Sequence, residues 1–398
     1  MKHFIILSAA ALLLTAPVFA QDPADATQEE GFVFTVQKAL PITSVKNQNR
    51  SSTCWAFSSL GFFESELLRL GKGEYDLSEM FLVHKTMEDR AQMSVRLHGD
   101  VSFSPGGSFH DAVYCWRNYG MVPQEAMPGI LYGDTLPNHG ELDAVAGGYV
   151  EAIAKGHLKK LSPVWQKGLC SLYDTYLGEC PEQFTYKGKT YTPRSFADEL
   201  GLKMDDYVSL TSFTHHPFYT QFALEIQDNW RQGQSYNLPL DELMSVMDNA
   251  IEKGYTFGWG ADVSETGFNR QGIGVVVDLN RGAELTGSDA AHWLGLSPDD
   301  KRRELTSKPL PEPEITPEMR QEGYDNWETT DDHGMLIYGI ATDQNGKPYY
   351  MVKNSWGTKY KYEGTWYVSK AFVAYKTINI LVHKDALPKD IAKKLGVK

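Results

Sequence analysis

Hydrophobic residues recur at every third or fourth position through much of the first part of the chain, the spacing of a helix with one buried face. The clearest case begins at Cys54, continues through Leu60 and Leu67, and stops at Gly71. Serine and threonine residues directly before Cys54 are typical helix N-caps. The same spacing predicts further helical stretches at residues 77–88, 109–119, 140–160, 191–204 and 240–253.

The pattern changes to that of strands towards the C-terminus. Strands are predicted at residues 255–259, 273–277, 335–342, 349–354, 364–369 and 376–383, with one early strand at residues 31–40. Asn345-Gly346 separates two of these strands and is the usual pair for a sharp hairpin turn. Residues 296–320 carry many charges and several prolines, which predicts a mobile surface excursion.

A helical first half and an antiparallel β second half predict an α+β fold with two lobes and a ligand cleft between them. The chain divides as follows: residues 1–20 a signal peptide, 21–125 a helical lobe, 126–240 an inserted and mainly helical subdomain, 241–383 a β lobe with its excursion at 296–320, and 384–398 a C-terminal arm.

Four residues lie in local patterns that a thiol protease needs. Cys54 precedes a tryptophan, His333 follows two aspartates, and Asn354 opens the run Asn-Ser-Trp-Gly. In such enzymes a thiolate attacks the carbonyl, an imidazole moves the proton, and a third group orients the imidazole. Gln48, six residues before the cysteine, is predicted to stabilise the oxyanion together with the Cys54 amide.

Two features predict a lowered pKa for the Cys54 thiol. The sulfur is expected in the first turn of a helix, whose positive end favours an anion. An imidazolium at His333 is expected to pair with the thiolate. Each residue also has an ordinary interpretation: a buried core thiol for Cys54, a surface histidine for His333, and an amide that solvates its loop for Gln48. The combination of motifs in this order favours the catalytic interpretation.

These motifs resemble those of the papain-like cysteine proteases, and more narrowly those of the bleomycin hydrolase and aminopeptidase C branch. The resemblance runs from about residue 35 to about residue 372, with gaps. It implies a helical lobe with the catalytic Cys helix and an antiparallel, β-barrel-like lobe with the catalytic His and Asn. It also implies substrate-binding roles for Gly106, Gly107 and Trp356, for which a plain turn and a core tryptophan are the alternatives.

The spacing of the motifs separates this chain from ordinary papain. His333 follows Cys54 by 279 positions and Asn354 by 300, whereas papain-like enzymes place both about 130–150 residues after the cysteine. The extra length is enough for a subdomain, and the bleomycin hydrolase branch carries a helical insertion of this kind. Ser51 departs from the family pattern, because papain-like proteins commonly have a disulfide-bonded cysteine at that position.

The resemblance also implies how the activity is restrained. In the bleomycin hydrolase branch a C-terminal arm lies in the cleft and limits cleavage to peptide N-termini, and the subunits form a hexamer. The terminal Lys398 of this chain departs from that pattern, because it would bring a cation to a site that attracts one.

The N-terminus predicts export. A basic start, a mainly apolar stretch at residues 4–14 and small residues before Gln21 are typical of a secretory signal peptide cleaved after Ala20. We therefore expect a periplasmic or extracellular protein that has no stable membrane span after cleavage. Only the 33 residues 21–53 then precede the cysteine, which leaves no room for the long prosegment of papain-type endopeptidases.

Composition and the remaining motifs narrow the function further. The net charge of −13 argues against nucleic-acid binding. Cys115 is interpreted as a structural thiol, while Cys170 and Cys180 are compatible with a disulfide or with two free thiols. His215-His216 is not interpreted as a metal site, since adjacent side chains point in different directions and no third ligand is evident. No metal or organic cofactor is expected.

The sequence therefore predicts an exported cysteine peptidase that acts on peptide substrates, with an aminopeptidase favoured and a thioacyl-enzyme as its intermediate. A papain-like endopeptidase is the alternative activity. A catalytically silent peptide-binding protein on the same scaffold, and acyl transfer to an amine instead of water, are the remaining alternatives.

Overall fold

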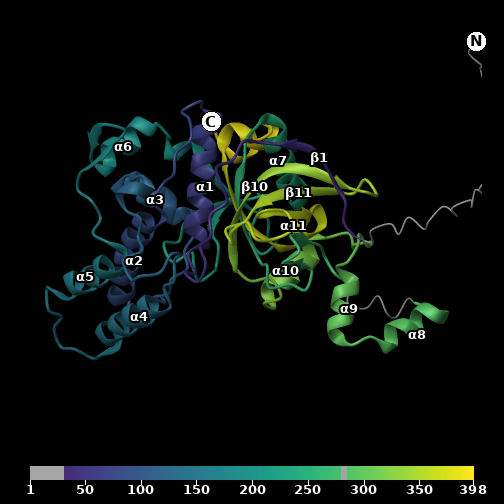
Figure 1. Ribbon diagram of the computed structural model, residues 1–398, viewed down its shortest axis with the longest axis horizontal. Helices are drawn as coiled ribbons and strands as arrows, with labels where there is room; N and C mark the ends of the chain where they lie inside the picture. Colours follow the sequence, from purple (N-terminus) through teal and green to yellow (C-terminus); the bar gives the residue numbers. More distant parts are fainter. Residues whose placement is uncertain (1–30, 279–284) are drawn as a thin grey trace, which may run out of the picture.

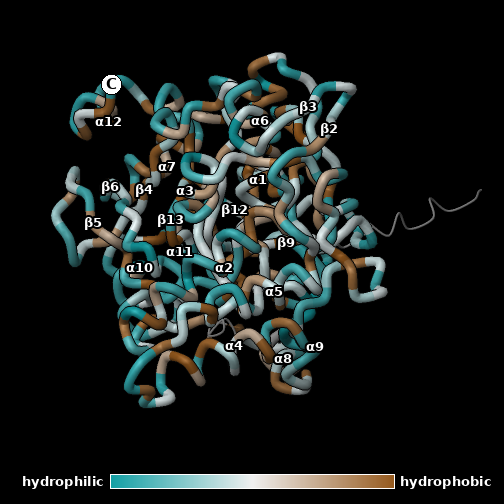
Figure 2. The backbone as a smooth tube through the Cα atoms, turned by 90° about the vertical axis from the view of Figure 1, so that its left-hand side faces the viewer, coloured by the Kyte–Doolittle hydropathy of each residue, from teal (hydrophilic) through white to brown (hydrophobic). Residues whose placement is uncertain are grey.

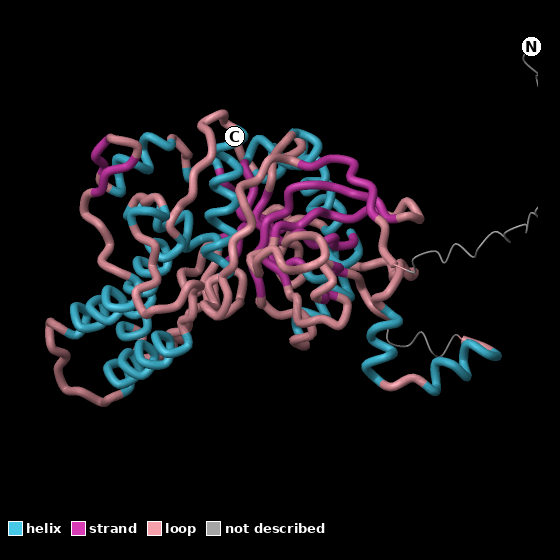
Figure 3. The backbone as a smooth tube through the Cα atoms, viewed as in Figure 1, coloured by secondary structure: helices cyan, strands magenta, loops and turns pink. Residues whose placement is uncertain are grey.

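The structure is a computed structural model of the protein and describes residues 31–278 and 285–398. The predicted signal peptide at residues 1–20 lies outside the described residues. Figures 1 and 3 show two lobes, one built mainly from helices and the other from a large sheet. This arrangement confirms the predicted α+β, two-lobed fold.

Helices form the first lobe, and a hydrophobic core that includes Phe63, Phe81 and Trp116 lies between them. They are α1 (Cys54–Arg69), α2 (Glu79–Arg96), α3 (Phe109–Tyr119), α4 (Gly140–Lys155), α5 (Trp165–Leu177), α6 (Pro193–Leu200) and the short helices η1 (Gln124–Ala126) and η2 (Met204–Asp206). A small hairpin of β2 (Phe184–Tyr186) and β3 (Lys189–Tyr191) is attached to them. Figure 2, in which this lobe faces the viewer, shows hydrophilic and hydrophobic segments along α4 and α5, as expected of helices with one buried face.

The second lobe is built on one mixed sheet, whose strand order is β5-β6-β4-β13-β7-β10-β11-β12-β9-β8, with β1 paired to β10. The strands are β1 (Phe34–Ala39), β4 (Tyr207–Thr211), β5 (Gln221–Ala223), β6 (Gln234–Asn237), β7 (Phe257–Ala261), β8 (Phe268–Asn269), β9 (Ile273–Gly274), β10 (His333–Asp343), β11 (Pro348–Lys353), β12 (Thr365–Ser369) and β13 (Thr377–His383).

Further helices follow or cover the sheet. They are α7 (Leu240–Lys253), α8 (Gly287–Gly295), α9 (Pro298–Leu305), α10 (Pro317–Asp325), α11 (Lys370–Lys376), η4 (Lys384–Ala386) and α12 (Lys389–Leu395). Leu243 and Ile251 of α7 share a core with Ile391 and Leu395 of α12 and with the sheet residue Trp259. The last helix is therefore anchored to the β lobe by apolar contacts.

Helix α1 is the element that joins the lobes. Every residue from Trp55 to Leu67 is buried, because the helix is covered by the helical lobe on one side and by β10 on the other. A residue at the start of α1 therefore lies where the two lobes meet.

The hairpin of β10 and β11 forms as predicted. The two strands are antiparallel, with Leu336 opposite Lys353. Asp343 Oδ1 accepts hydrogen bonds from the backbone N–H groups of Asn345 and Lys347, and Gly346 has φ +79°. A positive φ is easy for glycine, so the Asn-Gly pair closes the turn.

Several predicted segments differ from the structure. The segment predicted as a helical insertion, residues 126–240, ends in β4, β5 and β6, which extend the main sheet. The strand predicted at residues 273–277 is reduced to two residues. Residues 296–320, predicted as a mobile excursion, contain α9 and the start of α10. Glu312 fixes this segment through Lys347 and the Ser369 hydroxyl, partners that lie far away in the sequence.

Within the described residues, no helix has the length and apolar character needed to cross a membrane.

Candidate active site

The histidine and asparagine of the predicted site lie side by side. His333 begins β10 and Asn354 directly follows β11, so the hairpin places both at the same end of the strand pair. His333 Nε2 donates a hydrogen bond to Asn354 Oδ1 at 2.8 Å, and both side chains are buried. Trp356 stacks on the imidazole with a centroid distance of 4.9 Å and an angle of 28°. The ring of His333 is therefore held in one orientation and shielded from water.

Cys54 lies across the lobe interface from this pair. It is the first residue of α1, and it lines one pocket together with His333, Gly334 and Gly107. The predicted N-cap contact is absent, since the Thr53 hydroxyl meets the Ser51 hydroxyl at 2.5 Å and makes no cap hydrogen bond. The structure thus brings the predicted nucleophile and base together, although the local cap differs from the expectation.

The pKa values of the resting site differ from the sequence prediction. Burial raises the pKa of the Cys54 thiol to about 12, backbone hydrogen bonds involving Gly334 and Trp55 lower it, and the carboxylates of Asp331 and Asp228 raise it further. Burial lowers the pKa of His333 to about 4, against the opposing effect of its hydrogen bond to Asn354. Both shifts favour the neutral forms in the free site, because burial removes each charge from water and the nearby dipoles only partly compensate.

The predicted oxyanion residue Gln48 is fixed by the asparagine motif. The Ser355 hydroxyl donates to Gln48 Oε1 at 2.5 Å, and the Gln48 backbone N–H donates to the Ser355 carbonyl at 2.8 Å. Asn354 Oδ1 also accepts from the Ser355 N–H at 2.7 Å. Since its oxygen is occupied, the Gln48 amide keeps its nitrogen as the free donor, the polarity that an oxyanion needs.

Sequence analysis did not predict a role for Ser355. The run Asn-Ser-Trp-Gly contains it, but nothing in the pattern reveals a partner 307 positions away in the chain.

The two glycines of the predicted substrate cleft are required by close contacts. A Cβ on Gly107 would lie 2.7 Å from the Trp55 ring, and one on Gly106 would overlap the Asp228 carboxylate. The Gly106 carbonyl accepts a hydrogen bond of 2.6 Å from the buried Arg90, which also binds the carbonyl of Ser102. This extended segment is therefore held rigidly beside the nucleophile.

Three aspartates to which the sequence analysis assigned no role also line the Cys54 pocket, namely Asp228, Asp331 and Asp332. Burial raises the pKa of Asp331 to about 8, and the nearby charges of Asp228 and Asp332 act in the same direction. Asp228 has its pKa raised by burial against the opposing charge of Arg90, which is 3.4 Å away. Asp228 is far from the motifs in sequence, and Asp331 reads as part of an ordinary acidic loop, so neither carries a distinctive signal.

The other cysteines are separate from the site. Cys115, Cys170 and Cys180 are free, and Cys115 is buried in the helical core. The structure therefore has free thiols at the two positions for which the sequence left a disulfide open.

Comparison with known proteins agrees with this geometry. The model of the papain family of cysteine proteases matches residues 33–128, and the model of the peptidase C1-like family matches residues 318–398. The first match contains Gln48 and Cys54, and the second contains His333 and Asn354. The chain belongs to the papain-like cysteine peptidases. Within them it is placed in the branch of aminopeptidase C and bleomycin hydrolase by its similarity to curated proteins.

This peptidase is 24% identical to aminopeptidase C of Streptococcus thermophilus, over 90% of this chain and 84% of that protein. It is 24% identical to aminopeptidase G of Lactobacillus delbrueckii subsp. lactis, over 88% of this chain and 83% of that protein. The crystal structure of PepW from Lactobacillus rhamnosis has a TM-score of 0.65 to the peptidase at 18% identity, covering 91% of this chain and 84% of that one. This structural likeness shows a shared fold.

Proposed function

We propose that this peptidase is an exported aminopeptidase that removes N-terminal residues from peptides. Its similarity to aminopeptidases C and G extends over most of both chains, so it includes both halves of the candidate site. An aminopeptidase must hold the free ammonium group of the residue whose carbonyl is attacked, and that group lies only a few bonds from the reacting carbon. The acceptor for the ammonium must therefore be close to Cys54.

The two carboxylates beside Cys54 carry this proposal. Asp228 and Asp331 line the same pocket as the nucleophile, and the raised pKa of Asp331 shows that a further negative charge there is unfavourable without a cation. An ammonium group supplies that cation and shifts Asp331 towards its ionised form. A peptide whose N-terminus is acetylated offers no such charge.

The positions of the four site residues support the following reaction. As the Cys54 sulfur forms a bond to the scissile carbonyl carbon, its proton passes to His333, and the oxyanion is stabilised by the Gln48 amide and the Cys54 N–H. His333 then gives the proton to the leaving amine, which breaks the C–N bond and leaves a thioacyl-enzyme. A water molecule, deprotonated by His333, hydrolyses it and restores the thiol.

An endopeptidase is favoured by a different observation. Lys394 of α12 forms a salt bridge of 2.5 Å with Glu242 of α7, and Leu395 is buried in the core of the β lobe. The described residues after Asn379 do not line the Cys54 pocket. A cavity of about 750 Å³ adjoins that pocket and shares Ile226, Asp228 and Asp331 with it. This opening offers space beside the nucleophile for a longer peptide.

One experiment separates the two activities. The purified protein is incubated with paired peptides that carry a free or an N-acetylated N-terminus, and the products are identified by mass spectrometry. We expect release of N-terminal residues from the free peptides alone, with no release by the Cys54→Ala variant. Equal cleavage of both sets contradicts the aminopeptidase and supports the endopeptidase.

The variant Asp331→Asn tests the carboxylate directly. It removes the negative charge at nearly constant volume, so we expect a higher KM for free peptides with little change in kcat. An unchanged KM would assign no ammonium-binding role to this residue.

Export and assembly are further proposals with their own measurements. Cleavage after Ala20 yields a mature protein that begins at Gln21, which the intact mass of protein recovered outside the cytoplasm reveals. Hexamer formation is tested by the molar mass in light scattering coupled to size-exclusion chromatography.

A further inference from the structure

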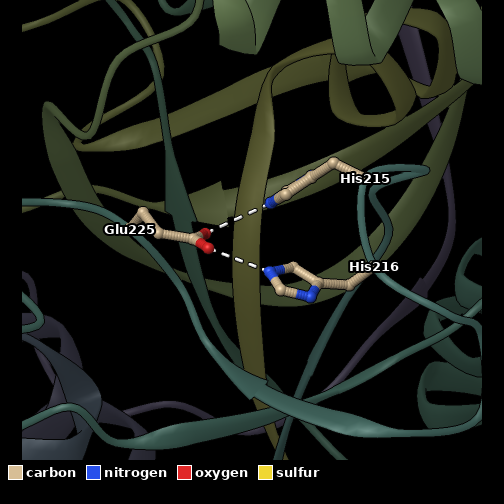
Figure 4. Close-up of side chains that lie close together, drawn as sticks. All are labelled: His215, His216 and Glu225. Carbon is tan, nitrogen blue, oxygen red and sulfur yellow. Dashed lines mark hydrogen bonds and ion pairs between the residues drawn. The ribbon is translucent and has the colours of Figure 1, made fainter.

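Two adjacent histidines and a glutamate come together beside the cavity that adjoins the Cys54 pocket. His215 and His216 lie in the loop between β4 and β5, and Glu225 follows β5. His215 Nε2 is 3.2 Å from Glu225 Oε2, and His216 Nε2 is 2.9 Å from Glu225 Oε1. Figure 4 shows both rings facing the same carboxylate.

The reasons given by the sequence against a metal site are wrong. Adjacent histidines were expected to diverge, but the turn of the loop directs both Nε2 atoms to one point, and their rings are 4.5 Å apart. A third ligand was not evident, but β5 returns the chain so that Glu225 lies opposite. The three ligand atoms all lie within 4.8 Å of one another.

The hydrogen bonds of Gln321 define which atom of His215 is free. Gln321 Oε1 is 3.1 Å from His215 Nδ1 and also accepts from the backbone N–H groups of Thr214 and His215. Because this oxygen only accepts, Nδ1 carries the hydrogen. Neutral His215 then presents the lone pair of Nε2 to a carboxylate oxygen. Two lone pairs at 3.2 Å repel unless a cation, either a proton or a metal ion, lies between them.

We propose that His215, His216 and Glu225 bind a divalent transition metal of the zinc class. Two imidazoles and one carboxylate are a common ligand set for such ions, and a fourth position remains for water. Tetrahedral zinc with ligands at about 2.0 Å places neighbouring ligand atoms about 3.3 Å apart. The two imidazole nitrogens lie at similar distances, 3.2 Å and 2.9 Å, from the two oxygens of the Glu225 carboxylate. The contact from His215 Nδ1 to Gln321 is the outer hydrogen bond that metal-binding histidines usually make.

The ligands are held in place before any ion binds. Asn237 donates to the carbonyls of Phe213 and His216, which fixes the loop from its inner side. His216 stacks on Phe222 at 4.1 Å, and the Tyr324 hydroxyl donates to the Glu225 carbonyl. Rigid support of this kind is what separates a metal site from a chance meeting of polar side chains.

The position of the site connects it to the catalytic cleft. His215 and Glu225 line the cavity of about 750 Å³, and the side chains of His215, His216 and Glu225 are 27%, 34% and 55% exposed, so an ion has access. Ile226 and Asp228, which follow Glu225 in the chain, line the Cys54 pocket. A bound metal ion would connect the loop before β5 to the segment after β5. It would thereby stabilise the position of Asp228 beside Cys54.

The test measures zinc binding in a Cys54→Ala background, because a thiol and an imidazole in the active site also bind zinc. Metal-free protein is titrated with ZnCl₂ by calorimetry and with CoCl₂ by visible absorption, where tetrahedral cobalt gives intense bands. We expect one ion per chain and a higher melting temperature with zinc. Gln321→Ala is expected to weaken binding by about 10–100-fold, the usual cost of an outer-shell partner, and His216→Ala and Glu225→Gln by more.

His292→Ala is the matched control, since His292 forms a single His–Glu pair of 3.2 Å with Glu304 and has no second histidine. It should leave zinc binding unchanged. Absence of binding at millimolar zinc overturns the proposal, and so does binding that Glu225→Gln and His216→Ala leave intact.

Discussion

The two halves of the active site are positioned by different means. Cys54 is placed by the start of one helix, α1, whose first turn has no side-chain cap. His333 and Asn354 are placed by the register of two strands joined through a turn. Fraying of the first turn of the helix moves the sulfur gradually. A register shift of one residue, in contrast, turns a side chain to the opposite face of the sheet. The base and its partner are therefore the more sharply determined half.

The surroundings of the base and of the nucleophile also differ in how firmly they determine the properties of each group. The ring of His333 has a fixed partner in Asn354 and a cover in Trp356. The sulfur of Cys54 lies among opposing influences: backbone hydrogen bonds favour the thiolate, while burial and two carboxylates disfavour it. The reactivity of Cys54 is thus the property that changes in its surroundings affect most.

Removal of the nucleophile is expected to have the largest effect on activity. Cys54→Ala should lower kcat by about 10⁶-fold, because the loss of one member of such a catalytic unit costs about as much as the loss of all. Peptide hydrolysis is the measurement, and Cys170→Ala, which removes a free thiol of the helical lobe, is the control. Comparable activity in the Cys54 variant would assign the chemistry to another residue.

Removal of the orienting amide should have the next largest effect. Asn354→Ala leaves His333 Nε2 without its acceptor and lets the ring tilt, so kcat should fall by about 100-fold, the usual cost of a misplaced catalytic group. Asn354→Asp keeps an acceptor oxygen and should retain more activity than the alanine variant. Equal losses in both would show that the hydrogen bond does not orient the ring.

Ser355→Ala tests how the two halves of the site are connected, because Ser355 binds Gln48 Oε1 through its hydroxyl and follows Asn354 in the chain. The Ser355→Ala variant releases Gln48 Oε1 and lets the amide rotate. Gln48→Ala, which removes the oxyanion donor, is expected to lower kcat by about 100-fold. Ser355→Ala should lower kcat by less. Ser58→Ala, which removes a hydroxyl that bonds only within α1, serves as the control. A double variant of Gln48 and Ser355 should be no slower than Gln48→Ala alone.

The smallest expected effect is a shift in the pH dependence of alkylation. The negative charge of Asp331 raises the pKa of Cys54, and Asp331 itself ionises near pH 8. Asp331→Asn should therefore leave the rate of iodoacetamide labelling unchanged below pH 8 and increase it a few-fold above, where the wild-type carboxylate opposes the thiolate. Labelling of Cys54 is followed by mass spectrometry, with Cys170 as the internal reference. A faster reaction of the wild-type protein at high pH would reverse the sign of the argument.

The sequence predicted those elements whose cause is local. Helices α3 and α7 follow from apolar periodicity, and the hairpin of β10 and β11 follows from strand alternation around an Asn-Gly turn. It was less successful for β4, a strand within the predicted helical insertion, because its pairing with β13 joins residues about 170 positions apart. The same limit applies to Ser355, Asp228 and Asp331, which become part of the site only when distant segments meet.

The sequence by itself determined the chemical groups of the active site and the order in which they occur, because a nucleophile, a base and an orienting amide need particular residue types within recognisable local motifs. Only the tertiary structure decided the charge state of those groups and their surroundings. Burial and the distance to other charges depend on which segments pack together, and it is packing that placed two carboxylates beside Cys54 and a glutamate opposite two histidines.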